Sequence, residues 1–91
     1  MARDDKLYSG FVRHDYLLTF SIAAPDARAR LVALCSGPWQ GDEVTPDTWE
    51  VSNDLTPEAM ESAIVELLSE GDRAAYYYLA SAKRLFRVLL R

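Results

Sequence analysis

The sequence is poor in the residues that usually build metal sites and covalent chemistry, with one cysteine, one histidine and four glycines among 91 residues. Because Cys35 has no second thiol to pair with, an intramolecular disulfide and a cysteine-rich zinc site are both excluded. His14 is the only imidazole, which excludes a metal site built from several histidines. The glycines are scattered along the chain, so they form no glycine-rich loop that could hold a phosphate group.

Long apolar runs are missing as well. No stretch approaches the ~18 consecutive apolar residues that a membrane-spanning helix needs. The opening residues, MARDDK, are too polar for a secretion signal. We therefore predict a cytoplasmic protein that does not enter a membrane.

The composition is that of an ordinary globular domain, with 49% hydrophobic, 11% aromatic and 26% charged residues. A chain of this length forms one domain, which buries only about 60–65% of the surface that its unfolded chain exposes. The core of a monomer is therefore marginal, and a dimer interface would add the apolar burial that it lacks. We accordingly expect a homodimer.

Charge is strongly segregated along the chain. Residues 31–72 carry ten acidic side chains and no Lys or Arg, whereas residues 73–91 carry five basic side chains and no acid. Such a pattern is typical of a strip that faces phosphates, and also of an acidic helix and a basic strand that neutralise each other. The sequence leaves both interpretations open, within one chain or across a dimer.

Hydrophobic periodicity predicts strands and helices in alternation. Residues 16–23 place apolar side chains on one face at every second position, which indicates a strand. A helix is expected to begin at Pro25, since proline suits the first helical turn, and to end at Gly37. Residues 39–44 and 48–53 then form a predicted hairpin.

The second half continues this pattern. Thr56 as N-cap and Pro57 in the first turn predict another helix, which Gly71 ends. Residues 74–80 contain three consecutive tyrosines and are predicted to be a strand. A last strand is expected over residues 85–90.

This order of elements predicts an α+β fold of the ferredoxin-like βαββαβ type, with an antiparallel sheet covered on one face by two helices. The domain is expected to span residues 15–91, after an N-terminal arm of residues 1–14. The additional C-terminal strand must pair with an edge, either of its own sheet or of a partner's. Its apolar side chains form the predicted dimer interface: Leu85, Phe86, Val88 and Leu89.

Candidates for catalysis are few. His14 precedes the first strand, where an imidazole could act as a general base or simply be solvated. Asp26 begins the first helix, where it could hold Mg²⁺ or stabilise the positive helix end. Cys35 falls on the apolar stripe of that helix and is predicted to lie in the core.

Three consecutive tyrosines, Tyr76, Tyr77 and Tyr78, suggest base stacking, as on the aromatic sheet faces of RNA-binding domains. Strand alternation places Tyr77 on the opposite face from its two neighbours, which argues against a full stacking platform. We therefore predict that these side chains serve core packing and a dimer face.

Four segments carry a family resemblance. They are the opening strand YLLTFSI at residues 16–22, DTWEV at 47–51, LTPE at 55–58 and EGDRAAYYY at 70–78. Together they resemble the CRISPR-associated protein 2 family and its solitary bacterial relatives, over about residues 15–80. The resemblance implies a ferredoxin-like fold and a homodimer in which the C-terminal strand often pairs with the partner's sheet.

The resemblance also implies an activity. Members of the family have been assigned metal-dependent nuclease activity, and in adaptation complexes their dimer acts as a scaffold for DNA. The proposed catalytic carboxylate of the family is an aspartate directly after an aromatic residue at the end of the opening strand. Here that position reads Phe20-Ser21, so the aspartate is missing, and Asp26 follows five residues later.

Two functions follow for this chain. The first is a non-catalytic homodimeric module that acts through protein contacts. The alternative is a nuclease or nucleic-acid-binding scaffold that uses Mg²⁺ held by Asp26. Its phosphate contacts would come from five basic side chains: Arg28, Arg30, Lys83, Arg84 and Arg87. A third hypothesis, a small-ligand sensor, has no specific support in the sequence.

Overall fold

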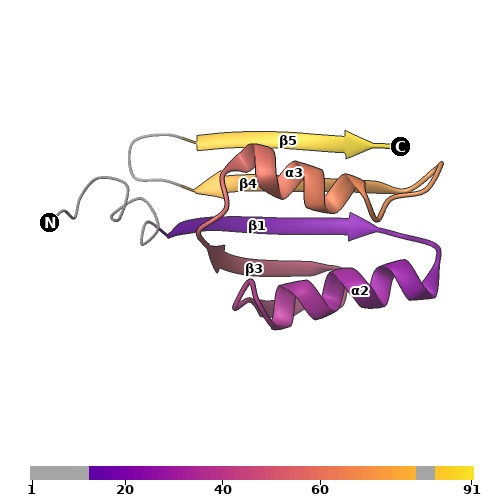
Figure 1. The fold of residues 1–91 in the computed structure, drawn as a ribbon, viewed down its shortest axis with the longest axis horizontal. Helices are drawn as coiled ribbons and strands as arrows, with labels where there is room; N and C mark the ends of the chain where they lie inside the picture. The colour runs from indigo at the N-terminus through magenta and orange to yellow at the C-terminus, as the bar shows by residue number, and fades with distance from the viewer. Residues whose placement is uncertain (1–12, 80–83) are drawn as a thin grey trace, which may run out of the picture.

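The protein is an antiparallel five-stranded sheet with two helices, seen in a computed structural model that describes residues 13–79 and 84–91 (Figure 1). Across the sheet the strands lie in the order β2-β3-β1-β4-β5. The bounds of the elements are β1 His14–Ser21, α2 Pro25–Ser36, β2 Asp42–Thr45, β3 Thr48–Asn53, α3 Pro57–Val65, β4 Arg73–Leu79 and β5 Arg84–Leu90. Neither described helix has the length and apolar character that crossing a membrane requires.

The predicted α+β architecture is confirmed. The first six elements follow one another as βαββαβ, and β1 lies in the sheet between β3 and β4, as in ferredoxin-like folds. β5 adds a seventh element and pairs antiparallel with β4 of its own chain, with Arg73 opposite Leu90 and Leu79 opposite Arg84. The sequence left open whether this strand pairs with its own sheet or with that of a partner. In the structure β5 pairs with its own sheet.

Several boundaries differ from the sequence prediction, among them that of β2, which begins at Asp42 rather than at residue 39. β1 begins at His14, so the last residue assigned to the arm belongs to the sheet, and residues 1–12 lie outside the described residues. α3 ends at Val65, well before Gly71, because the chain tightens there: the amides of Leu67 and Leu68 bond to carbonyls three residues back. Leu68 is still buried, so the apolar stripe continues past the end of the helix.

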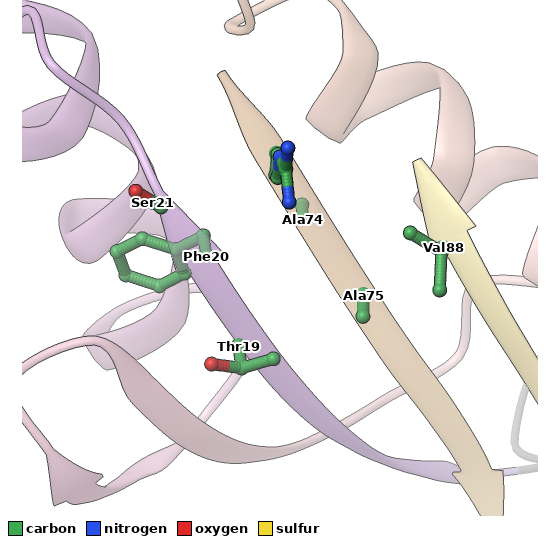
Figure 2. Close-up of a pocket in the computed structure, with 7 residues that line it drawn as sticks. Thr19, Phe20, Ser21, Ala74, Ala75 and Val88 are labelled. Carbon is green, nitrogen blue, oxygen red and sulfur yellow. The ribbon is translucent and has the colours of Figure 1, made fainter. Parts of the chain in front are cut away.

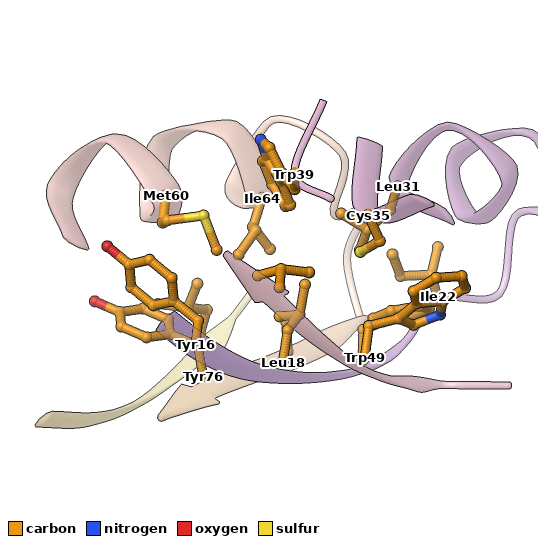
Figure 3. Close-up of a cluster of buried hydrophobic side chains, with 14 of the residues drawn as sticks. Tyr16, Leu18, Ile22, Leu31, Cys35, Trp39, Trp49, Met60, Ile64 and Tyr76 are labelled. Carbon is orange, nitrogen blue, oxygen red and sulfur yellow. The ribbon is translucent and has the colours of Figure 1, made fainter. Parts of the chain in front are cut away.

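One face of the sheet is buried beneath the two helices. In β1, Tyr16, Leu18 and Phe20 are buried while the residues between them are exposed. Leu18 lies opposite Trp49 on one side and Tyr76 on the other, so a single row of large side chains crosses three strands. Figure 3 shows the core that these side chains form with those of the helices, among them Leu31, Cys35, Met60 and Ile64.

The turn that leads into β4 is stabilised by hydrogen bonds to a buried carboxylate. Asp72 is only 5% exposed, and its carboxylate oxygens accept hydrogen bonds from the backbone N–H of Ala23 at 3.1 Å and of Ser69 at 2.8 Å. Gly71 precedes it with φ of 93°, a left-handed conformation that favours glycine. Asp72 thus links the end of β1 to the chain that follows α3.

Candidate functional site

The face of the sheet opposite the helices carries a row of exposed apolar side chains. Leu17 of β1 lies opposite Tyr77 of β4, and Tyr77 lies opposite Phe86 of β5. The rings of Tyr77 and Phe86 are in contact, with centroids 5.6 Å apart. Together with two neighbours on β5 these residues form what we call the open-face patch: Leu17, Tyr77, Phe86, Val88 and Leu90, between 38% and 65% exposed.

The patch exists because strand alternation turns these residues away from the core. In β4 the buried Ala74 and Tyr76 point toward the helices, so Tyr77, which directly follows Tyr76, must point to the other face. No helix covers this face in the described part of the chain (Figure 1). Contiguous apolar surface of this kind on a small domain usually marks an interaction site.

A shallow hollow of about 230 Å³ adjoins the patch. Figure 2 shows small side chains at its floor on adjacent strands, with Thr19 and Ser21 on β1 and Ala75 on β4, and with Val88 at the side of β5. Arg73 also lines it. The open face therefore has both protruding apolar side chains and a hollow beside them, a relief into which a complementary surface can pack.

The buried face holds Tyr16 and Tyr76, and the hydroxyl groups of both act as hydrogen-bond donors. The Tyr16 hydroxyl donates to the Leu55 carbonyl at 2.6 Å, and the Tyr76 hydroxyl donates to Glu61 Oε2 at 2.7 Å. Burial raises the pKa of both phenols well above the ordinary range, and for Tyr76 the hydrogen bond to Glu61 adds to that rise. Both therefore stay protonated at neutral pH.

The two catalytic candidates lie at opposite ends of β1. His14 begins the strand, where its Nδ1 lies 2.7 Å from the Tyr78 hydroxyl. Asp26 is exposed in the first turn of α2, beyond the other end. Since an eight-residue strand spans roughly 25 Å, the two side chains cannot act on one substrate atom. Within the described ranges, no three His, Cys, Asp or Glu side chains come together in a way that could hold a metal ion.

Cys35 lies in the core, as its position on the helix predicts. Its side chain is fully buried, and burial raises the pKa of the thiol from 9.0 to about 12. A thiol in that state is a poor nucleophile at neutral pH.

The three basic candidates whose side chains the structure describes do not gather on one surface. Arg28 pairs with Asp47 at 2.6 Å, donates to the Pro46 carbonyl and lies over the Phe20 ring, near the β2–β3 hairpin. Arg30 lines a hollow between the two helices. Arg87 lies 3.3 Å from Glu61 on the helix side of β5. Lys83 and the side chain of Arg84 lie outside the described residues.

The residues predicted at the dimer interface divide between the two faces. Phe86 and Val88 are exposed in the open-face patch, whereas Leu89 is 7% exposed and packs in the core. The side chain of Leu85 lies outside the described residues. Sequence reasoning did not assign Leu17 or Leu90 to an interface. It gave the three tyrosines of β4 to core packing and a dimer face, and the structure shows that Tyr77 is the one on the open face.

No protein-family model, curated protein or solved structure matches this chain.

Proposed function

We propose that this protein is a non-catalytic homodimeric module that acts through protein contacts. The open-face patch is the observation that carries the proposal. It places five large apolar side chains in water on a face made by β1, β4 and β5, and burying such side chains is the main favourable contribution to protein association. The small size of the chain, which limits its own core, supports the same conclusion.

The nuclease alternative gains no support from the site. A nuclease that uses Mg²⁺ needs an oxygen ligand placed beside the phosphate, and Asp26 stands apart from the other candidates at an exposed helix start. Metal-dependent cleavage, the resemblance to the CRISPR-associated protein 2 family and a cytoplasmic location all stay predictions.

A pair of valines tests the proposal. Val88 in the patch and Val44 on β2 are almost equally exposed, at 54% and 58%, but they lie on strands at opposite edges of the sheet. We expect Val88→Asp to weaken self-association by more than tenfold, about 1.4 kcal/mol, because a charged side chain would replace an apolar one at the contact between the copies. Val44→Asp should leave association unchanged.

The measurement is sedimentation equilibrium of the wild-type chain and both variants, with circular dichroism to show that each is folded. A wild-type chain that stays monomeric at high micromolar concentration would contradict the proposal. Equal weakening by the two substitutions would assign the loss to added negative charge rather than to the patch.

A further inference from the structure

The two edges of the sheet are very different. β2 is a four-residue strand that begins with two acidic side chains, is exposed throughout and has an irregular register against β3. β5 has seven residues and pairs with β4 in an unbroken register. Short, charged and irregular edges resist pairing with another strand, whereas a long regular apolar edge favours it. The β2 edge is therefore protected against pairing with another strand, whereas the β5 edge is able to pair.

The hydrogen bonds at the end of β5 show which backbone groups face outward. The Arg91 N–H donates to the Asp72 carbonyl, and the Arg91 carbonyl accepts from the Gly71 N–H, so Arg91 faces the β4 side. Backbone groups in an antiparallel strand alternate in direction from one residue to the next. The N–H and C=O groups of Phe86, Val88 and Leu90 therefore point away from β4, and no described strand pairs with them.

The two faces of β5 also differ in chemistry. Phe86, Val88 and Leu90 carry their side chains on the open face, where they are more than half exposed. On the helix face, Arg87 pairs with Glu61, and Arg91 donates to the Val65 carbonyl. An added strand with the same alternation would continue an apolar row on one face and a basic row on the other.

The flank of α3 beside β5 is acidic, which suits such a strand. A groove of about 610 Å³ there is lined by Glu58, Glu61, Ser62, Val65, Glu66 and Arg91. Within the described ranges, Glu58 and Glu66 form no ion pair. A basic side chain on the helix face of an added strand would reach these two carboxylates, since neighbouring strands lie only about 4.8 Å apart.

We propose that the β5 strands of two copies pair antiparallel at this edge, joining their sheets into one. The inference rests on the proposed homodimer and names its contact. The second copy fits because its β5 supplies both rows at once: Phe86, Val88 and Leu90 extend the open-face patch, and Arg87 and Arg91 face the acidic flank of α3. The pairing leaves the two patches side by side as one larger surface for a partner protein.

Charge selects the register of the pair. If Arg87 lay opposite the second copy's Arg87, two like charges would meet directly, which destabilises a strand pair. With Val88 opposite Val88, Phe86 meets Leu90 and each Arg87 meets a Leu89, so the guanidinium groups are separated. This register also makes Val88 a hydrogen-bonded pair, because its backbone groups point outward in both copies.

Replacing Val88 by proline tests the contact. Val88→Pro keeps an apolar side chain and removes one N–H that the β4–β5 pair does not use, and proline is tolerated where a strand amide faces solvent. We expect a folded variant whose dimer dissociates at least tenfold more readily, measured by sedimentation equilibrium. Val88→Thr, which keeps the amide and the branched shape, should remain close to wild type.

Each outcome separates the contact from the proposed function. If Val88→Pro still forms the dimer while Val88→Asp does not, the copies stack through their open faces, and the edge pairing is overturned while the homodimer stands. If Val88→Pro fails to fold, hydrogen exchange of the wild-type chain decides instead. The amides of Phe86, Val88 and Leu90 should be protected in the dimer and exchange rapidly on dilution, and rapid exchange in the dimer would overturn the inference.

Discussion

Three buried protonated side chains make the stability of the fold sensitive to alkaline pH. Cys35 is fully buried with a pKa raised from 9.0 to about 12, and burial also raises the pKa values of Tyr16 and Tyr76. In each case the folded chain holds its proton more tightly than the unfolded chain does. The contribution to stability is therefore complete below the ordinary pKa and is lost as the pH rises above it.

We expect the free energy of unfolding to stay constant from pH 7 to 8 and to fall once the pH passes about 9, where the thiol of the unfolded chain ionises. Urea unfolding at half-unit intervals up to pH 10.5 measures this. Cys35→Ala should be less stable overall but should lose the part of the decline that starts near pH 9. A wild-type stability that is level to pH 10.5 would contradict the assignment.

At the scale of elements, the two helices begin in unequal ways. Thr56 caps α3 with its hydroxyl, which accepts a hydrogen bond from the Ala59 N–H at 3.3 Å. The residue at the same place before α2 is Ala24, which is extended and has no side-chain acceptor to offer. Both helices continue with a proline in the first turn, so the two starts differ mainly in the cap.

Substitutions at the two caps should therefore have opposite signs. Thr56→Ala is expected to cost about 1 kcal/mol of stability, because an amide of the first turn of α3 loses its partner. Ala24→Ser is expected to add about 0.5–1 kcal/mol by supplying the missing acceptor. Chemical unfolding of both variants gives the comparison, and a loss of stability in Ala24→Ser would show that the backbone there cannot place a cap.

The sequence predicted the helices and strands better than it predicted the contacts between them. The order of elements was predicted by alternation in β1, by the Pro and Gly signals around α2 and by the tyrosines of β4. Alternation also predicted that Tyr77 lies on the opposite face from its two neighbours, but not which face that is. Asp72 was not predicted, because its partners Ala23 and Ser69 are backbone amides that carry no sequence signal. Leu89 was assigned to an interface, but only the register of β5 against β4 shows that it faces the helices.

At the scale of the whole molecule, the segregated charge is partly neutralised within one chain. Arg87 of the basic C-terminal segment meets Glu61 of the acidic middle segment at 3.3 Å. Glu58 and Glu66 lie on the same flank of α3, in the groove that β5 borders. An interface that uses these carboxylates attracts its partner through exposed charges, which dissolved salt screens.

We therefore expect self-association to weaken several-fold as NaCl rises from 50 to 500 mM, because the Debye length shrinks across that range. Glu66→Lys should weaken association at low salt and should flatten the salt dependence. Glu43→Lys, on β2 at the other edge of the sheet, is the matched control and should change neither. Association that grows stronger with salt would indicate a contact that depends on apolar burial alone.

The inequality of the two edges also limits how far the protein can assemble. A sheet that pairs at both edges can grow into an endless fibre, as amyloid does. In the proposed pairing, one step through β5 would use up the long regular edge of both copies, and each outer end of the joined sheet would then be a short acidic β2. Growth would stop after that step, so the edge that favours association would also limit the assembly to two copies.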